Sequence, residues 1–317
     1  MDNTSNIEIV DLTDFREGNI TKKTGFVQSL GQAFVKTGFV AVKNHTLRDE
    51  DAEMLYAESK KFFALPDEVK QKYEIEGLAG QRGYTAFGKE HAKGRKEGDL
   101  KEFWHIGQEV EGDDPIREIY PDNISPTEIS GLNTAGIKVY KAMEQTGKYL
   151  LRAIALYLGL DELYFDDKIY NGNSILRPIH YGPISGNPKN AMRAAEHEDI
   201  NLITLLMGAS AEGLEILSKS REWVPVTALP NQIVVNVGDM LQRLTNNKLR
   251  SSTHRVVNPP EELWHSSRYS IPFFLHPRPE MPLDCLESCI DNEHPKRFEN
   301  ITAGEYLSQR LREIGLK

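Results

Sequence analysis

Short apolar segments, each bounded by glycine, proline or asparagine, fill much of the second half of this 317-residue chain. They cover residues 201–207, 214–217, 232–237 and 269–275. Segments this short have the length of β-strands and not of ordinary helices. Short strands that follow one another with turn residues between them predict a sandwich or a barrel.

Helical patterns lie on both sides of this β-rich region. Phe26, Leu30 and Phe34 are four residues apart and predict one apolar stripe of a helix. That helix is expected to end at Gly38, because glycine readily adopts the left-handed conformation that terminates helices. Residues 302–317 also carry apolar residues at helical spacing and predict an amphipathic helix.

A longer helix is predicted to begin near Ser125. A proline follows Ser125, and Glu128 comes three residues after it, which is the order of an N-cap, a first-turn proline and a capping-box acid. Apolar residues then recur on one face up to Leu158, so we expect this helix to brace the β-rich region. Segment 77–99 carries several glycines among many charged residues and predicts a long mobile loop.

The charge balance of the chain is acidic. Lys and Arg number 38 against 47 Asp and Glu, and the net charge of −9 argues against nucleic acid or an anionic membrane as a partner. No apolar run approaches a membrane span, and the first residues do not form a secretory signal. Cys285 and Cys289 are the only cysteines, so we expect free thiols in a reducing compartment, the cytoplasm. The sequence does not specify an oligomeric state.

His197, Asp199 and His254 are the residues whose types most favour a metal site. In an extended segment His197 and Asp199 point to the same side, because side chains alternate along a strand. A β-rich domain can fold back and bring His254 to the same point. Two histidines and one carboxylate on one face of a metal leave the other positions open, as in non-haem Fe(II) oxygenases.

Arg268 and Ser270 also alternate onto one side of a predicted strand, which covers residues 269–275. A guanidinium and a hydroxyl side by side suit a carboxylate, since the planar fork of arginine matches its two oxygens and keeps its charge. This pair predicts an anchor for a carboxylate ligand.

These residues, taken together, resemble the Fe(II)/2-oxoglutarate-dependent oxygenases, and specifically their isopenicillin N synthase-like branch. Segments 38–45 (GFVAVKNH), 62–66 (FFALP), 81–84 (QRGY) and 101–107 (KEFWHIG) also resemble motifs of that branch. The resemblance implies an α+β, mainly β, fold with a double-stranded β-helix (jelly-roll) core flanked by helices. It implies an N-terminal dioxygenase region, a bracing helical segment, the jelly-roll core and a helical tail, at residues 1–125, 126–172, 173–280 and 281–317.

The resemblance also implies a role for each of the residues singled out above. His197, Asp199 and His254 would bind Fe(II), with O2 taking an open position, and Arg268 with Ser270 would hold the far carboxylate of 2-oxoglutarate. The expected reaction gives succinate and CO2.

Tyr181 matches the strand that precedes the triad in this branch and is expected to line the co-substrate site. Ile179 stands where that strand usually has an asparagine that helps to bind the metal-proximal end of 2-oxoglutarate. Arg177 is therefore a candidate for the same contact, and an ordinary structural ion pair is the competing interpretation.

Four residues are candidates for contact with a small-molecule substrate: Tyr84, Glu102, His105 and Phe274. Glu102 and the acidic surface favour a cationic substrate, such as an amino acid with a basic side chain or a related metabolite. Phe103 and Trp104 are predicted to be core residues, since large aromatics dominate cores. Among the other histidines, His180 is predicted to be buried in the core and His276 to lie at the surface.

Three functions follow from these predictions. The first is a 2-oxoglutarate-dependent enzyme that hydroxylates or desaturates a small molecule. The second is an oxidase on the same scaffold that uses no 2-oxoglutarate, and Arg268 with Ser270 does not separate the two, because isopenicillin N synthase keeps a similar pair for its substrate. The third is a non-catalytic jelly-roll protein that binds a metal. Asp199 argues against a halogenase, since related halogenases have a small residue in that place.

Overall fold

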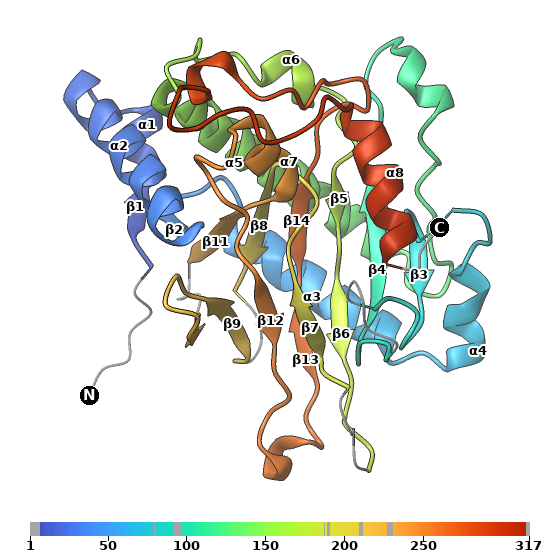
Figure 1. Ribbon diagram of the computed structural model, residues 1–317. Coiled ribbons are helices and arrows are strands. Elements are labelled where there is room, and N and C mark those ends of the chain that lie inside the picture. Colours follow the sequence, from blue (N-terminus) through green and yellow to red (C-terminus); the bar gives the residue numbers. More distant parts are fainter. Residues whose placement is uncertain are drawn as a thin grey trace.

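The computed structural model describes residues 7–78, 80–91, 97–186, 188, 191–208, 212–226 and 231–314. Within these ranges the chain forms a mixed α+β fold, in which helices pack around two β-sheets (Figure 1). The helices are α1 (Leu12–Arg16), α2 (Ile20–Thr37), α3 (Asp49–Phe63), α4 (Asp67–Lys70), α5 (Gly131–Tyr157), α6 (Asp166–Ile169), α7 (Asp239–Leu244) and α8 (Ala303–Glu313). Short 3-10 helices cover Gln71–Tyr73, Pro115–Glu118, Glu261–Leu263 and Glu287–Cys289.

Two sheets contain the described strands. In order across the larger sheet these are β1 (Ile9–Asp11), β2 (Phe39–Lys43), β11 (Gln232–Val237), β8 (Ile203–Met207), β14 (Pro272–Leu275), β5 (Ile175–Leu176), β4 (Glu102–Gly107), β6 (Ile179–Tyr181) and β13 (Arg268–Ser270), with β3 (Gly83–Thr85) paired to β4. The smaller sheet has the order β10 (Trp223–Pro225), β9 (Leu214–Leu217), β12 (His254–Val256) and β7 (Ala194–His197). The predicted β-rich region is present, and among these strands only β1 and β2 pair in parallel.

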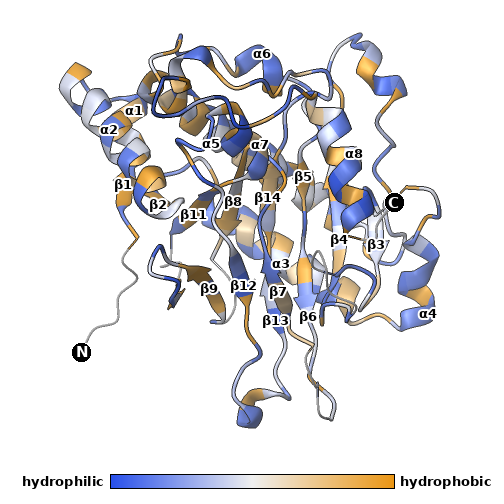
Figure 2. Cartoon of the chain, viewed as in Figure 1, coloured by the Kyte–Doolittle hydropathy of each residue, from blue (hydrophilic) through white to orange (hydrophobic). Residues whose placement is uncertain are grey.

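Helix α5 is the long helix that braces the larger sheet. Met143, Leu150 and Ile154 lie on its inner face and are fully buried, and the helix contacts α2, α3 and β14. A Cβ at Gly147 would come within 2.2 Å of Leu275 on β14, so the close approach of helix and strand depends on this glycine. Strand β14 contributes Phe273 and Leu275 to the hydrophobic core. Its neighbour β8 is coloured as hydrophobic in Figure 2.

The predicted start of this helix near Ser125 is wrong, because the cap-like residues there bind elsewhere. The hydroxyl of Tyr73 donates to Glu128 and accepts from the backbone N–H of Thr127 at 2.9 Å. Asn133 Nδ2 donates to Ser125 Oγ at 3.0 Å. The helix therefore begins only at Gly131, and Ser125 to Glu128 form a turn that Tyr73 holds.

Two further expectations need correction. Segment 77–99 is not a loop throughout, since it contains β3, and Glu90 and Asp99 within it are buried; residues 79 and 92–96 lie outside the described residues. Segment 269–275 is not one strand either. It breaks at Ile271, so that β13 pairs with β6 while β14 pairs with β5 and β8.

The ends of two other helices agree with their sequence patterns. Helix α2 stops at Gly38, which has φ +74° and whose N–H bonds to the carbonyl of Phe34. Helix α8 begins with a complete capping box between Thr302 and Glu305. Both signals are local hydrogen-bond arrangements, and among the described residues no distant side chain competes at these two helix ends for the groups named.

A buried ion-pair network connects the N-terminal region to the larger sheet. Lys70 Nζ lies 2.7 Å from Glu102 Oε2, and these residues are only 3% and 1% exposed. Tyr84 donates to the same oxygen at 2.5 Å, and His180 Nδ1 binds Glu102 Oε1 at 2.7 Å. Glu102 is therefore a packed structural carboxylate that joins α4, β3 and β6.

Replacing Lys70 with methionine should lower the free energy of unfolding by about 3 kcal/mol, because it leaves the buried Glu102 carboxylate without its cation. Urea unfolding measures this loss. Lys61→Met is the matched control, since Lys61 is 59% exposed in its pair with Glu58, and such pairs contribute about 0–1 kcal/mol. Equal losses in the two variants would show that the network does not stabilise the fold.

Candidate metal centre and flanking pockets

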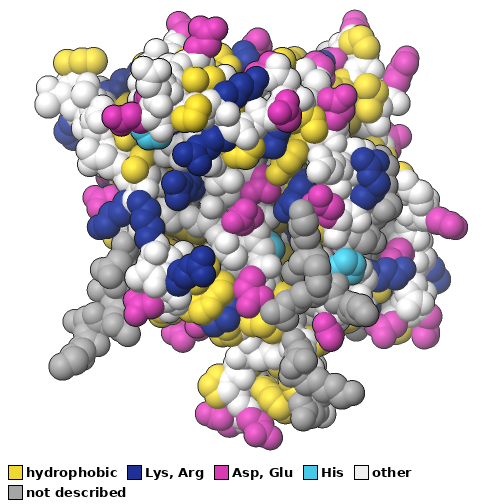
Figure 3. Space-filling model, viewed as in Figure 1, with side chains coloured by type: hydrophobic (Ala, Val, Ile, Leu, Met, Phe, Trp, Pro, Cys, Tyr) yellow, Lys and Arg dark blue, Asp and Glu magenta, His cyan; other side chains and the backbone are white. Residues whose placement is uncertain are grey.

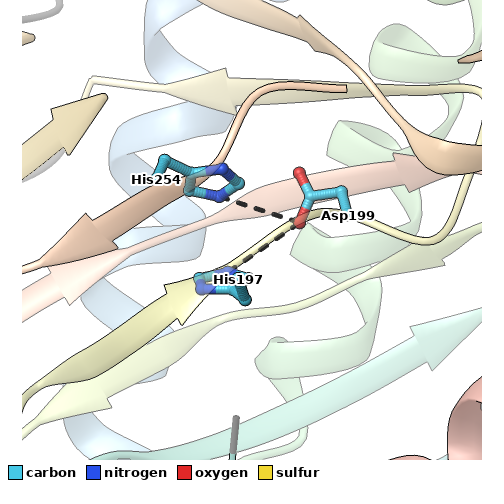
Figure 4. Close-up of side chains that lie close together, drawn as sticks. All are labelled: His197, Asp199 and His254. Carbon is cyan, nitrogen blue, oxygen red and sulfur yellow. Dashed lines mark ion pairs between the residues drawn. The ribbon is translucent and has the colours of Figure 1, made fainter. Parts of the chain in front are cut away.

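Three predicted ligands converge where the two sheets face each other. His197 ends β7, Asp199 lies two residues further along, and His254 begins β12, directly opposite His197 in the strand register. The possible ligand atoms of the three side chains all lie within 4.8 Å of one another. Figure 4 shows the side chains pointing toward a common point, with Asp199 Oδ1 3.9 Å from His197 Nε2 and 3.8 Å from His254 Nε2.

Backbone carbonyls set the tautomer of both imidazoles. His197 Nδ1 lies 2.7 Å from the carbonyl oxygen of Ala195, and His254 Nδ1 lies 3.0 Å from that of Ser252. A carbonyl only accepts, so each Nδ1 carries the hydrogen and each Nε2 keeps its lone pair. Such hydrogen bonds are the usual way in which proteins orient histidine ligands toward a metal.

Asp199 is held by polar side chains on its second oxygen. Thr204 Oγ1 donates to Asp199 Oδ2 at 2.6 Å and Asn236 Nδ2 donates at 2.8 Å, which leaves Oδ1 facing the histidines. Desolvation raises the pKa of the carboxyl, but the two histidine rings and these hydrogen bonds outweigh it, so the pKa lies below its ordinary value. Desolvation and the neighbouring His254 ring lower the pKa of His197 to about 4. Near neutral pH the site therefore offers a carboxylate from Asp199 and an unprotonated imidazole from His197.

This donor set fits Fe(II). Two imidazole nitrogens and one carboxylate oxygen on one face are the ligands of non-haem iron oxygenases, and they leave coordination positions for a chelating co-substrate and for O2. Thr204 and Asn236, which orient the carboxylate, are partners that the sequence interpretation did not identify. A signal was present, however, because each is a polar residue inside an otherwise apolar strand and therefore needs a hydrogen-bond partner.

The predicted carboxylate anchor lies in a pocket with the triad, which we call the anchor pocket. Arg268 and Ser270 on β13 line it together with His197, Asp199 and His254. The other described residues that line it are Phe39, Lys101, Arg177, Ile179, Tyr181, Ala194, Thr204, Leu206, Leu214, Val234, Asn236, Val256, Pro272 and Phe274.

The guanidinium of Arg268 is deeply placed in the anchor pocket. Arg268 is 1% exposed and Ser270 4% exposed. Tyr181 lies opposite Arg268 in the register of β6 and β13, and the guanidinium carbon is 5.0 Å from the centre of its ring. Ile179 lies opposite Ser270. The side chains expected to receive a co-substrate are thus on the same pair of strands.

A second pocket, the outer pocket, adjoins His197 and Asp199 of the triad. It shares Lys101, Arg177, His197, Asp199 and Phe274 with the anchor pocket. The residues that line it alone are Gln81, Glu90, His91, Asp99, His105, Ile175, Glu196, Glu198, Ile200, His276, Leu307, Arg310, Leu311 and Ile314. Helix α8 covers one side of the outer pocket, and Figure 1 shows this helix in front of β4 and β5.

Of the four residues predicted to contact substrate, two line the outer pocket and two do not. His105 and Phe274 line the outer pocket, whereas Tyr84 and Glu102 bind each other in the buried network and do not line it. Arg177 reaches both pockets, where it bonds to Glu90 and to His105. Phe103 and Trp104 are fully buried, as predicted.

His276 corrects one expectation about the histidines. The sequence predicts a surface position, but His276 is only 7% exposed and lines the outer pocket. Its position just after β14 looks like a strand end in the sequence, and nothing local shows that α8 covers this end. His180 is buried, as predicted.

Comparisons with known proteins agree with this geometry. The family model for the 2OG-Fe(II) oxygenase superfamily matches residues 172–277, and the model for the N-terminal region of non-haem dioxygenases in morphine synthesis matches residues 7–128. Proline hydroxylase buaE of Petromyces alliaceus is 35% identical to this chain over 96% of the chain and 98% of that protein.

Solved structures are similar over nearly the whole chain. One from Caulobacter crescentus, assigned to the 2OG-Fe(II) oxygenase family, has a TM-score of 0.87 and 41% identity and covers 98% of this chain and 100% of its own. A full-length Neurospora crassa protein in complex with alpha-KG (2-oxoglutarate) has a TM-score of 0.84 and 32% identity, with 96% of each chain covered. The same Neurospora crassa protein was also solved with alpha-KG and thymine.

The chain therefore belongs to the 2OG-Fe(II) oxygenase superfamily, in its isopenicillin N synthase-like branch. It is an enzyme that uses Fe(II) and 2-oxoglutarate and acts on small molecules. The non-catalytic alternative and the oxidase without 2-oxoglutarate are not supported. Among the described residues no helix is both long and apolar enough to cross a bilayer. The face in Figure 3 carries acidic and basic side chains interspersed.

Proposed function

We propose that this enzyme hydroxylates a small molecule bound in the outer pocket, while 2-oxoglutarate occupies the anchor pocket of a jelly-roll core. The observation that carries the proposal is the common pocket of the Fe(II) triad and the buried Arg268–Ser270 pair. The triad supplies the open metal face, and the pair supplies a carboxylate anchor at a second point. A ligand with a chelating end and a distant carboxylate matches both.

Arg268 would bind the distal carboxylate of 2-oxoglutarate through two parallel N–H groups, and Ser270 would add a hydroxyl donor. Packing against Tyr181 holds the guanidinium in place, which reduces the entropy lost when a ligand binds. Arg177 is a weaker candidate for a co-substrate contact, because Glu90 and His105 already bind it. These contacts favour the structural interpretation of Arg177.

Bound Fe(II) would supply the activation of O2 that is coupled to oxidative decarboxylation. In the balanced reaction, 2-oxoglutarate, O2 and R–H give succinate, CO2 and R–OH, with one oxygen atom entering succinate and the other the product. The chain's own residues would position the reactants in two pockets that both adjoin the triad. Helix α8 limits the access of water to the outer pocket, which protects reactive species from side reactions.

Hydroxylation is preferred over desaturation because of the relatives. The Petromyces alliaceus relative is named a proline hydroxylase, and the Neurospora crassa protein was solved with thymine. Both compounds are small and cyclic. They support a substrate of similar size here, and they leave open whether it is an amino acid or an uncharged heterocycle.

Anaerobic titration of the protein with Fe(II) and 2-oxoglutarate tests the proposal. We expect a weak visible charge-transfer band, and then succinate on exposure to O2, with one labelled oxygen when 18O2 is used. Succinate added in place of 2-oxoglutarate is the control, since it lacks the keto group and should give no band. If neither the band nor labelled succinate forms with 2-oxoglutarate, the proposed function is wrong.

A further inference from the structure

Two cations that line the outer pocket are already paired: Lys101, which precedes β4, and Arg177, which lies between β5 and β6. Lys101 Nζ lies 2.6 Å from Glu90 Oε1 and 2.8 Å from Asp99 Oδ2. Arg177 Nη1 lies 3.2 Å from the same Glu90 oxygen, and Arg177 Nε donates to His105 Nε2 at 2.5 Å. A carboxylate on the substrate would therefore have to compete with carboxylates of the protein for these two cations.

Helix α8 contributes a third cation, and it is paired as well. Arg310 Nη1 donates to Glu313 Oε2 at 2.7 Å, and Arg310 Nη2 lies 3.5 Å from Asp239 Oδ2. Among the described residues, each Lys or Arg that lines the outer pocket thus has an acidic partner. This pocket is poorly suited to a free carboxylate.

Three residues that line the outer pocket each have a buried polar atom with no hydrogen-bond partner within the described residues. These atoms are Glu90 Oε2, His276 Nδ1 and Arg310 Nε. Glu90 and His276 are 8% and 7% exposed, so both side chains are more than nine-tenths buried. A buried polar atom without a partner costs about 1–3 kcal/mol, and a ligand that satisfies it recovers that free energy.

The chemistry of each atom determines whether it can donate a hydrogen bond to a ligand or accept one from it. Burial raises the pKa of Glu90, but Arg177 and Lys101 outweigh it and hold the pKa well below the usual range, so Glu90 Oε2 only accepts hydrogen bonds. Burial lowers the pKa of His276 to about 4, so its ring is neutral near pH 7, with one nitrogen that donates and one that accepts. Arg310 Nε only donates.

Six apolar residues from strand ends, the turn after β7 and the end of α8 also line the outer pocket: Ile175, Ile200, Phe274, Leu307, Leu311 and Ile314. They lie beside further polar lining residues, namely Gln81, His91, Asp99, His105, Glu196 and Glu198. Apolar surface interrupted by polar groups favours a ligand that has apolar faces and a polar edge. A compact ring with hydrogen-bonding groups in its plane has this character.

We infer that the substrate is an uncharged ring compound of the cyclic amide or imide type, which offers an N–H to Glu90 and a carbonyl oxygen to His276 or Arg310. This inference rests on the proposed function and specifies its substrate class. It favours a heterocycle over an amino acid, because an amino acid would bring a carboxylate to cations that are already neutralised.

Calorimetric titration of the anaerobic protein, loaded with Fe(II) and 2-oxoglutarate, tests the inference with matched pairs of ligands. Uracil is compared with orotate, and 2-pyrrolidinone with pyroglutamate, since the members of each pair differ by one carboxylate; proline is the amino-acid probe. We expect uracil or 2-pyrrolidinone to bind at least about tenfold more tightly than its partner and than proline, because a buried, poorly compensated charge is costly. Equal or tighter binding of the carboxylates, or no binding of either uncharged ring, would overturn the inference.

His276→Phe keeps the ring and removes both nitrogens, so it should weaken binding of the uncharged ring roughly five- to tenfold. His294→Phe is the matched control at an exposed position, with 59% of the side chain accessible. Unchanged affinity in His276→Phe would contradict the assigned contact. The wild-type protein should slowly form succinate from 2-oxoglutarate without added substrate. Its absence from the wild-type protein would instead count against the proposed function.

Discussion

Replacing His197 or Asp199 with alanine should abolish Fe(II) binding and, with it, 2-oxoglutarate turnover. Each of these residues supplies one of three ligand positions, whose atoms lie within 4.8 Å of one another. Changes to residues that only orient ligands typically cost 10–100-fold in metal affinity or activity, so removal of a ligand should cost at least about a hundredfold. Asp199→Ala should be the more severe of the two, because it also removes the only negative charge of the triad.

Metal content after anaerobic loading, together with the visible band of the 2-oxoglutarate complex, measures this effect. His294→Ala is the control, since it removes an exposed imidazole that is remote from the triad in sequence. Circular dichroism of each variant separates loss of metal from loss of fold. Stoichiometric iron and an intact band in both His197→Ala and Asp199→Ala would show that the metal lies elsewhere.

The metal triad could be predicted because two histidines and an aspartate in this arrangement have few roles other than metal binding. His197 and Asp199 are adjacent on one side of an extended segment, and this geometry depends on the local backbone alone. Placing His254 beside them required the strands to pair, and the resemblance to a family supplied that step. The structure then places His254 opposite His197 in neighbouring strands.

The residues around the triad were harder to predict because their environment comes from distant parts of the chain. Glu102 was predicted to contact the substrate, yet it is buried, where it pairs with Lys70 from α4 and hydrogen-bonds to His180 from β6. His276 looked like a surface residue because the covering helix α8 begins more than twenty residues later in the sequence. Burial of a polar residue depends on which element packs over it, and local sequence carries little information about that.

The start of α5 shows a similar limit at the level of secondary structure. Ser125, Thr127 and Glu128 form a pattern that resembles an N-cap, and the pattern is genuine as a local preference. The hydroxyl of Tyr73, which is remote in sequence, bonds to the backbone N–H of Thr127 and to the side chain of Glu128. These groups therefore connect to the N-terminal region and do not cap the helix. Tertiary hydrogen bonds of this kind override local preferences.

Replacing Arg268 with alanine should raise the concentration of 2-oxoglutarate needed for half-maximal turnover by about a hundredfold, which corresponds to roughly 2.7 kcal/mol. Arg268 is 1% exposed, so water cannot easily take the place of its guanidinium. Removal of the guanidinium would leave the carboxylate of the ligand without a partner. Fe(II) content should stay near normal, since Arg268 is not a ligand. Arg268→Lys is the informative control: it keeps the charge but loses the planar fork, and should fall between the wild-type protein and Arg268→Ala.

Steady-state succinate formation at varied 2-oxoglutarate, with iron measured in the same samples, decides the role of Arg268. An unchanged 2-oxoglutarate requirement in Arg268→Ala would remove Arg268 from the co-substrate site. If the same variant instead weakened only the binding of the compound in the outer pocket, the anchor would belong to the substrate, as in the oxidases of this branch. The two results differ because Arg268 lines the anchor pocket and not the outer pocket, and the two pockets share few residues beyond the triad. A selective effect on 2-oxoglutarate would therefore assign the anchor pocket to the co-substrate and leave the outer pocket for the molecule that is oxidised.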